Sequence, residues 1–290
     1  MSKTLLHFDY LSPRTIKEAG ALLAKHKGAK LLAGGTDLMV SLREGAVTPE
    51  YVINLKAIAD LSYIRSDGEG LKIGATTTIH DIEHSPIVQE RSPILASAAH
   101  QLGSPLIRTM ATIGGNLCNA TPSADTPPAL VALNASVRLV SARGERTLPL
   151  SEFFVGPGKT ALKNDEILTE IQIPIQPAHS GGAYATFFES RAEDRTAAGV
   201  AAIITLDAPG TKVAAARIVL GTVAPTPVRA GKAEDILTGK AISDELIEQA
   251  AQAAAEAAIP RRRLFFKKEL VKVLARQAIK QAADSAKPPA

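Results

Sequence analysis

The first motif that indicates chemistry is a pair of adjacent glycines followed by a hydroxyl and a carboxylate. Gly34 and Gly35 come directly after a short apolar run, and Thr36 and Asp37 follow them. Glycine allows positive φ values and close approach of a ligand, so successive N–H groups there can form a nest for a pyrophosphate. Thr36 can add a hydroxyl donor. A tight turn between a strand and a helix is the alternative, and this motif alone would favour that alternative.

A second pair of glycines with polar neighbours occurs further along the chain. Gly114 and Gly115 stand between Thr112 and Asn116, and a segment of small and polar residues, Asn119 to Asp125, follows. We expect both motifs to form glycine-rich loops, and two such loops in one chain favour a phosphate-bearing ligand over two unrelated turns. Neither motif matches G-x-G-x-x-G, so a dinucleotide-binding Rossmann unit is not indicated.

A third glycine-containing segment resembles a phosphate-binding P-loop only superficially. Gly156 to Thr160 contains Gly-Pro-Gly-Lys-Thr, but a P-loop requires glycine at the position of Phe153. Pro157 would also remove an N–H donor that should face the phosphate. We predict a turn at this place.

One histidine pattern literally matches a zinc-protease signature. His80, Glu83 and His84 stand in the order H-x-x-E-H, and on a helix the two histidines would share one face. Pro86 limits that helix almost immediately. The pattern favours a short surface helix with polar residues in its first turn, and we assign no metal ligands and no catalytic residues from it.

The single cysteine, Cys118, limits the redox chemistry that this chain can carry. One thiol forms no internal disulfide and cannot supply the four ligands of an iron–sulfur cluster. No Gly-x-Ser-x-Gly motif is present and no histidine adjoins Cys118 in the sequence, so we interpret it as a small buried residue rather than a nucleophile.

Composition and charge argue against nucleic-acid and membrane proteins. The 290 residues are 46% apolar and 21% charged, which is ordinary for a globular protein in water. A net charge of +4 over this length is weak evidence for nucleic-acid binding, and the basic run from Arg261 to Lys268 favours a solvated helix face. The first residues lack the apolar core of a signal peptide, and no apolar run approaches the ~20 residues of a membrane span. We expect a cytoplasmic protein.

Three segments with different periodicities must position these motifs. The first alternates strand, helix and strand, with Thr15 as a helix N-cap and parallel character. The second predicts short helices, a hairpin around residues 137–149 and a strand near residues 168–174. We interpret residues 179–182 as a linker. After it the pattern predicts antiparallel strands and then helices over 243–258 and 264–283, an α+β module.

The two glycine motifs, in this order and at this spacing, together with Pro122 to Asp125, closely resemble the FAD-binding medium subunits of the molybdenum hydroxylases. That family includes carbon monoxide, xanthine and nicotinate dehydrogenases, and the resemblance covers nearly the whole chain. It implies a mixed α+β fold: a two-subdomain FAD-binding fold of the vanillyl-alcohol-oxidase type, followed by an α+β C-terminal domain. The expected FAD-binding domain spans residues 1–177, with subdomains of about 1–58 and 59–177, and the C-terminal domain spans 183–290.

The same resemblance implies which residues hold the cofactor. The first motif would wrap the pyrophosphate, the second would hold the other side of the diphosphate and the ribityl chain, Asp125 would hydrogen-bond the flavin end, and Leu102 and Leu168 would pack on the cofactor. The family often has a lysine near residues 187–191, where this chain has Glu189 and Ser190, so only Arg191 is carried over as a basic residue. The predicted FAD-binding residues are Leu31, Leu32, Ala33, Gly34, Gly35, Thr36, Asp37, Leu38, Leu102, Thr112, Ile113, Gly114, Gly115, Asn116, Asp125, Leu168 and Arg191.

The resemblance also implies partners and a reaction. A large subunit would hydroxylate the substrate at a molybdenum cofactor, and electrons would pass through two 2Fe–2S clusters of a small subunit to FAD in this chain. FAD would deliver them to NAD, a quinone or O2. We expect a dimer of heterotrimers. Flavin subunits of 4-hydroxybenzoyl-CoA reductases carry an extra cluster on inserted cysteines, and the solitary Cys118 disfavours that subtype.

Two other functions stay open at this point. A self-contained FAD-dependent oxidase or dehydrogenase would need its own substrate pocket with a base, and the third segment contains no evident cluster of His or Tyr. A non-catalytic α/β interaction protein would use the glycines only as turns. The substrate of the complex is not determined by this chain, because the molybdenum pocket would lie in another subunit.

Overall fold

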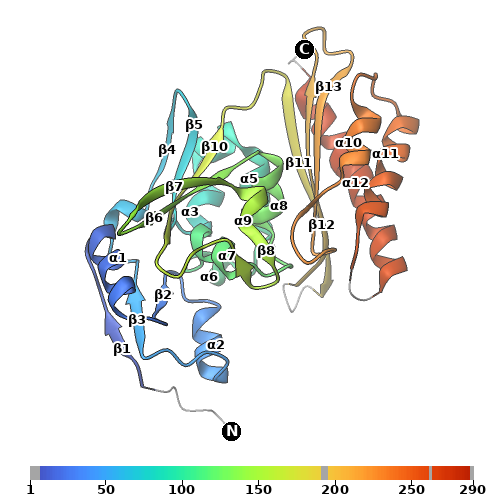
Figure 1. Ribbon diagram of the computed structural model, residues 1–290. Helices are drawn as coiled ribbons and strands as arrows, with labels where there is room; N and C mark the ends of the chain where they lie inside the picture. Colours follow the sequence, from blue (N-terminus) through green and yellow to red (C-terminus); the bar gives the residue numbers. More distant parts are fainter. Residues whose placement is uncertain (1–6, 191–194, 261–262, 288–290) are drawn as a thin grey trace.

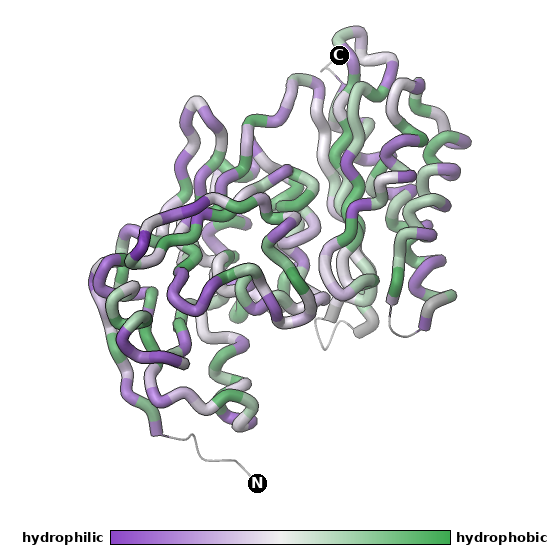
Figure 2. The backbone as a smooth tube through the Cα atoms, in the orientation of Figure 1, coloured by the Kyte–Doolittle hydropathy of each residue, from purple (hydrophilic) through white to green (hydrophobic). Residues whose placement is uncertain are grey.

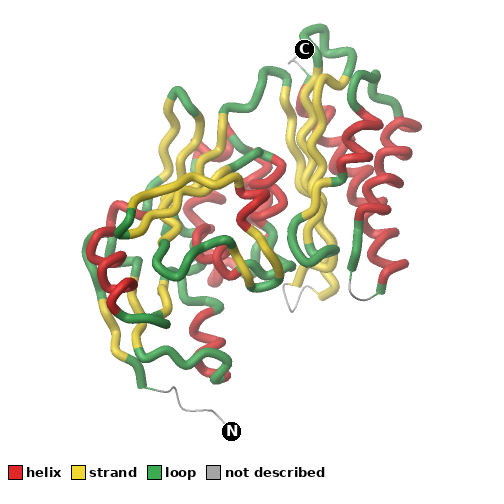
Figure 3. The backbone as a smooth tube through the Cα atoms, in the orientation of Figure 1, coloured by secondary structure: helices red, strands yellow, loops and turns green. Residues whose placement is uncertain are grey.

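The computed structural model describes residues 7–190, 195–260 and 263–287, which form three main sheets arranged side by side along the chain (Figure 1). The N-terminal end lies on one side of the molecule, the middle region lies at its centre, and the C-terminal helices lie on the opposite side. Helices and strands are interspersed in the first two regions, whereas in the C-terminal region the strands come first and the helices follow them (Figure 3). None of the helices in the described ranges is both long and apolar enough to cross a membrane.

The first region is a small parallel sheet with two helices. Its strands are β1 (Asp9–Leu11), β2 (Lys30–Leu32) and β3 (Tyr51–Asn54), in the order β1-β3-β2. Helix α1 (Ile16–Lys25) begins at Thr15, whose hydroxyl accepts a hydrogen bond from the Glu18 N–H at 3.1 Å, as the capping pattern predicts. Helix α2 (Leu38–Glu44) follows β2 and ends at Gly45, with φ 71°. The parallel pairing predicted for this segment is confirmed.

The middle region is a five-stranded antiparallel sheet covered by short helices. The strands run in the order β4 (Ile64–Asp67), β5 (Gly70–Gly74), β10 (Ile167–Pro174), β6 (Ser136–Ser141) and β7 (Gly144–Pro149). The helical turns are Ala59–Leu61, α3 (Ile79–His84), α4 (Pro86–Arg91), α5 (Pro93–Gln101), α6 (Pro105–Arg108), α7 (Ile113–Asn119), α8 (Thr126–Ala132) and α9 (Leu150–Phe153). Gly156 to Thr160 forms the turn of the hairpin β8 (Phe154–Gly156) and β9 (Lys159–Thr160), as predicted.

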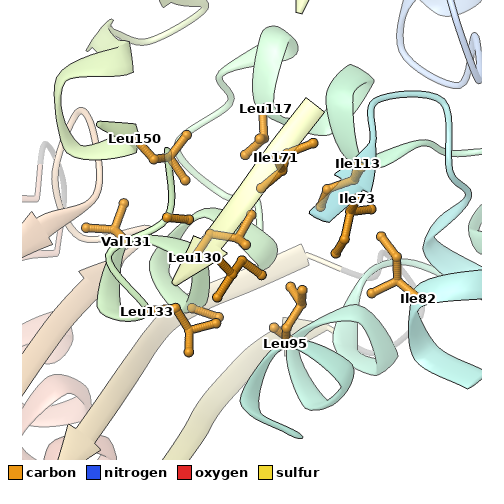
Figure 4. Packing of buried hydrophobic residues seen from close by; sticks show 14 of the residues in the cluster. Ile73, Ile82, Leu95, Ile113, Leu117, Leu130, Val131, Leu133, Leu150 and Ile171 are labelled. Atoms are coloured by element: carbon orange, nitrogen blue, oxygen red, sulfur yellow. The ribbon is translucent and has the colours of Figure 1, made fainter. Parts of the chain in front are cut away.

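The core of the middle region packs helix α7 onto the sheet. Ile73 of β5 and Ile171 of β10 point toward Ile113 and Leu117 of α7, and all four side chains are fully buried (Figure 4). Leu130 of α8 closes the same cluster. Hydrophilic residues gather instead at the tip of the β4–β5 hairpin (Figure 2). In the apolar core under α7, burial of each side chain stabilises the fold by about 1.5–3 kcal/mol. This core therefore holds the second glycine motif firmly against the sheet.

The C-terminal region is an antiparallel sheet with helices on one face. Its strands are β11 (Ser180–Ser190), β12 (Arg195–Leu206), β13 (Val213–Gly221) and β14 (Val228–Arg229), and its helices are α10 (Gly231–Leu237), α11 (Asp244–Ala257) and α12 (Leu264–Ala286). In α12, Val271, Leu274, Ala275, Ala278 and Ala282 recur at helical spacing and are buried against the sheet. The opposite face of the sheet meets α5 and α8 of the middle region (Figure 1).

The linker predicted at residues 179–182 is wrong, because β11 begins at Ser180 and includes both glycines. A Cβ on Gly181 would lie 2.1 Å from the Ala282 carbonyl oxygen, and one on Gly182 would lie 3.2 Å from Cβ of Ile94. The glycines therefore allow α12 on one face and α5 on the other to approach the strand closely. Gly181 and Gly182 do not form a flexible linker here.

The first prediction concerns this close contact between strand and helix. Gly181→Ala should lower the free energy of unfolding by about 1–3 kcal/mol, because α12 must move away from β11 to admit the methyl group. Gly231→Ala is the matched control in the same region, since a Cβ there meets nothing within 4 Å. Chemical unfolding followed by circular dichroism measures both variants. Equal stability of Gly181→Ala and wild type would contradict the packing described.

Candidate functional site

The first glycine motif connects β2 to α2 and presents a row of free backbone donors. Gly35 has φ 80°, a left-handed conformation that glycine adopts without strain. Within the described ranges, the N–H groups of Gly34, Gly35, Thr36 and Asp37 donate to no protein acceptor. Gly34, Gly35 and Thr36 are half-buried. Four successive donors ahead of a helix N-terminus carry partial positive charge, and they suit a diphosphate.

Gly34 brings the first motif into direct contact with the segment that precedes the second. A Cβ on Gly34 would lie 2.2 Å from the Met110 carbonyl oxygen and 2.9 Å from Cα of Ala111. A Cβ on Gly115 would lie 4.0 Å from Cβ of Ala33, so the two glycine motifs are neighbours in space. The structure therefore brings together two segments that the sequence places far apart.

The second motif is the first turn of helix α7, which corrects the prediction of a second glycine loop. The Thr112 hydroxyl caps this helix by accepting the Gly115 N–H at 3.2 Å, and the Asn116 N–H donates to the Thr112 carbonyl at 2.9 Å. The Gly114 N–H donates to the Ala75 carbonyl at 2.9 Å. These donors already have partners, because the cap accepts the Gly115 N–H and the Ala75 carbonyl, outside the helix, accepts the Gly114 N–H. The free donor of this motif is the Asn116 amide, whose oxygen accepts from the Thr126 hydroxyl at 2.6 Å.

Glycine is required at position 114 because Ala75 packs closely against it, and not because of its backbone conformation. A Cβ there would lie 2.7 Å from both the carbonyl oxygen and Cβ of Ala75. Next to it, Thr78 and Thr112 form an isolated antiparallel bridge, in which the Ile79 N–H donates to Ala111 at 2.9 Å and the Ile113 N–H donates to Thr77 at 3.1 Å. The second motif is thus tied by its backbone to the start of α3.

Arg108 is a buried residue that the sequence analysis missed, and it organises the turn before the second motif. Its guanidinium donates to the carbonyl oxygens of His100, Leu102 and Gly103 at 3.0, 3.2 and 2.9 Å. It also lies 2.7 Å from Glu83 Oε2, so the buried charge is paired. Leu102, a predicted cofactor contact, is 8% exposed at this turn. The sequence does not predict the ion pair between Glu83 and Arg108, because the two residues lie on different helices, α3 and α6.

Asp125 is a buried carboxylate held by two hydroxyls from the C-terminal sheet. The Tyr184 hydroxyl donates to Asp125 Oδ1 at 3.0 Å, and the Thr196 hydroxyl donates to the same oxygen at 2.8 Å. Burial raises the pKa of Asp125 to about 6, although both hydrogen bonds lower it. Sequence reasoning missed Tyr184 and Thr196, which lie in strands far from the motif along the chain.

The remaining predicted residues fall in different places. Leu168 lies in β10 opposite Leu139 and is 3% exposed, within the core of the middle sheet. Arg191 lies outside the described residues. Burial raises the pKa of Cys118 to about 12, so its thiol stays protonated near neutral pH and is a poor nucleophile. The donor set of the two motifs fits a diphosphate-containing cofactor, because free N–H groups, a free amide and close backbone approach meet at one place.

Comparisons with known proteins cover nearly the whole chain. Residues 6–176 match the family model described as the FAD binding domain in molybdopterin dehydrogenase, and residues 183–282 match the CO dehydrogenase flavoprotein C-terminal domain. The chain is 35% identical over 280 residues to the carbon monoxide dehydrogenase medium chain of Hydrogenophaga pseudoflava, covering 96% of each chain. It is 32% identical to the glyceraldehyde dehydrogenase medium chain of Sulfolobus acidocaldarius, covering 95% of this chain and 98% of that one.

Solved structures give the same result. A structure of carbon monoxide dehydrogenase from Hydrogenophaga pseudoflava superposes with a TM-score of 0.92 at 35% identity, covering 97% of this chain and 99% of that chain. Quinoline 2-oxidoreductase from Pseudomonas putida 86 gives a TM-score of 0.92 at 28% identity, covering 98% of this chain and 99% of that chain. The predicted fold class, a mixed α+β FAD-binding domain followed by an α+β C-terminal domain, is confirmed.

The second prediction tests the contact between the two motifs. Gly34→Ala should weaken FAD binding by roughly tenfold or more, because a clash costing about 1–3 kcal/mol separates the two motifs. Fluorescence titration of the cofactor-free chain with FAD measures the affinity. Gly68→Ala is the control, since a Cβ there meets nothing within 4 Å. Unchanged affinity in Gly34→Ala would exclude this contact as a determinant of binding.

The third prediction follows from the raised pKa of Asp125. Because its pKa of about 6 lies above the ordinary value near 3.8, the unfolded chain releases this proton first. The stability that the raised pKa contributes is therefore complete below pH ~4 and is lost as the pH rises through ~6. Asp125→Asn keeps the acceptor for both hydroxyls and should be more stable than wild type at pH 7.5 by about 1–3 kcal/mol.

Urea unfolding of the cofactor-free chain between pH 4 and pH 8 measures this difference. The two curves should converge toward pH 4, where the wild-type carboxyl is protonated in both states. A constant difference over the whole range would show that Asp125 does not titrate in this window.

Proposed function

Because the chain belongs to the family of FAD-binding medium subunits of the molybdopterin hydroxylases, we propose that it passes electrons from the iron–sulfur clusters of a partner subunit through FAD to an external acceptor. The observation that carries this proposal is the row of four free N–H groups at Gly34 to Asp37, placed against the second motif by a backbone contact. This arrangement suits the diphosphate of FAD, which the chain would hold through its backbone.

In this proposal each part of the site has its own task. Residues Leu31 to Leu38 wrap the diphosphate through backbone donors, and Thr36 adds its hydroxyl. Thr112 to Asn116 approach the other side of the diphosphate and the ribityl chain, with the Asn116 amide as the free donor. The N–H groups at the N-terminal end of α2 carry partial positive charge, which favours binding of the phosphate anions.

The flavin end of the cofactor is assigned to Asp125, which contacts the C-terminal sheet and would hydrogen-bond the flavin. Leu102 and Leu168 of the middle region would pack on the cofactor, and Arg191, which lies outside the described residues, is the proposed basic residue. Tyr184 and Thr196 keep the Asp125 carboxylate in a fixed orientation through hydrogen bonds of 3.0 and 2.8 Å. We place the FAD-binding domain at residues 1–177, with a division near residue 58, and the C-terminal domain at 183–290.

The chain supplies binding and position, while the cofactor supplies the redox chemistry. When bound, FAD exchanges electrons singly or in pairs, which suits a carrier between one-electron clusters and a two-electron acceptor. The chain's own residues hold the diphosphate, exclude water from the buried Asp125 and keep the Cys118 thiol protonated. In this proposal no general acid or base of this chain takes part in the transfer, whereas a self-contained oxidase would need one at its own substrate pocket.

The proposed partners are a large molybdopterin-binding subunit and a small subunit with two 2Fe–2S clusters, assembled as a dimer of heterotrimers. The relatives named as medium chains support this, since that name implies a larger and a smaller companion. The substrate is selected at the molybdenum site of the large subunit, and the acceptor is NAD, a quinone or O2.

The fourth prediction separates a carrier subunit from an independent oxidase. The purified chain should bind one FAD and should not turn over small alcohols or acids. In the complex with both partner subunits, the substrate should bleach the flavin absorbance. A complex built with Gly34→Ala and freed of FAD should still reduce its iron–sulfur clusters with substrate, but should lose transfer to the acceptor.

Electron paramagnetic resonance follows the clusters and visible absorbance follows the flavin and the acceptor. The complex with Gly68→Ala is the control and should behave like wild type. Turnover by the chain alone, or full acceptor reduction by the complex without FAD, would overturn the proposed role.

A further inference from the structure

Three of the six histidines of this chain meet on the surface of the middle region, and none of them is among the residues assigned to FAD. His80 and His84 lie on α3, and His100 lies on the last turn of α5. All three are exposed, whereas Glu83 between them is half-buried. The proposed electron transfer gives these residues no role.

The helix places two imidazoles side by side with a carboxylate. His80 and His84 are four residues apart, and their ring centroids are 4.2 Å apart. The ligand atoms of His80, Glu83 and His84 all lie within 4.8 Å of one another. A tetrahedral zinc site with bonds of ~2.0–2.2 Å separates its ligand atoms by roughly 3.4 Å. Small rotations of the two exposed imidazoles toward the half-buried Glu83 carboxylate would bring the ligand atoms to this separation. The predicted short helix is confirmed, because α3 runs from Ile79 through His84, and both histidines share one of its faces as expected for residues four apart.

The ring of His84 is already in the tautomer that can bind a metal through Nε2. Its Nδ1 lies 2.9 Å from the His80 carbonyl oxygen, which can only accept, so Nδ1 carries the proton. The neutral ring then leaves the lone pair of Nε2 free. A metal-binding histidine usually donates its other ring N–H to an acceptor such as a backbone carbonyl.

Glu83 is held as an anion from the other side. Its Oε1 accepts from His100 Nδ1 at 2.7 Å, and its Oε2 lies 2.7 Å from Arg108 Nε. A carboxylate has about four acceptor positions, and these two contacts leave room for a further ligand bond. The two contacts also fix its orientation, because Arg108 is buried and tied to three carbonyl oxygens.

We propose that His80, Glu83 and His84 form a binding site for one divalent transition-metal cation of the zinc type. Two imidazoles and one carboxylate suit Zn²⁺ and disfavour Mg²⁺ and Ca²⁺, which prefer oxygen ligands. Water completes the coordination. The site is tied to the cofactor region, since Thr78 caps α3 and pairs through its backbone with Thr112. Bound metal therefore stabilises the segment that carries the second glycine motif.

The fifth prediction is tested with the full chain loaded with FAD and with Zn²⁺ as the probe. Competition against a chromophoric chelator should show one saturable equivalent of Zn²⁺. His80→Gln and His84→Gln should each weaken binding on the order of tenfold or more, and the double variant should abolish this equivalent. Zn²⁺ should raise the melting temperature of wild type but not of the double variant.

His7→Gln is the matched control, since it also removes an exposed imidazole, and it should bind Zn²⁺ like wild type. The same FAD content in all variants shows that folding is unaffected, because the substituted side chains are exposed. Binding that survives in the double variant, or that is lost equally in His7→Gln, would overturn the site. So would the absence of saturable binding in wild type.

Discussion

The constraint on which the rest of this structure depends is the backbone-to-backbone contact at Gly34. A Cβ at that position would lie 2.2 Å from the Met110 carbonyl oxygen, so only glycine lets the parallel sheet meet the middle region there. The contact sets the distance between the two glycine motifs, and among the residues that the structure describes the N–H groups of Gly35 to Asp37 have no acceptor. An N–H group without an acceptor at the junction of two regions costs free energy. This row of unpaired donors therefore indicates a bound ligand.

The two glycine motifs perform different physical tasks although they look alike in the sequence. The first supplies free donors from a left-handed turn. The donors of the second already have acceptors in the protein, either the cap of α7 or the backbone of residues 75–77, and its glycines allow Ala75 and Ala33 to come close. Rigidity comes from the core beneath α7, where Ile113 and Leu117 pack on Ile73 and Ile171. The donor segment is thus set against a firmly packed helix, which limits the conformations that a bound cofactor can adopt.

The C-terminal region is joined to the rest by buried polar contacts as well as by packing. Tyr184 and Thr196 donate to Asp125, and Arg217 donates from β13 to the Ala132 carbonyl oxygen and to Gln176 Oε1, both at 2.5 Å. Burial lowers the pKa of Arg217, as it raises that of Asp125, because both charges are removed from water. Such contacts fix the angle between the two regions, because a buried polar group that loses its partner destabilises the fold.

The sequence by itself determined the fold class, the family and the two motifs. Apolar periodicity, caps and paired glycines are local features, and Cys118 as the only cysteine excluded an iron–sulfur cluster in this chain. Only the tertiary structure decided that Gly34 touches Met110, that the second motif is a capped helix, and that Gly181 serves strand packing. It alone revealed the partners of Asp125 and of Glu83. These contacts join residues from different elements, and no local pattern encodes the distances that close packing sets between them.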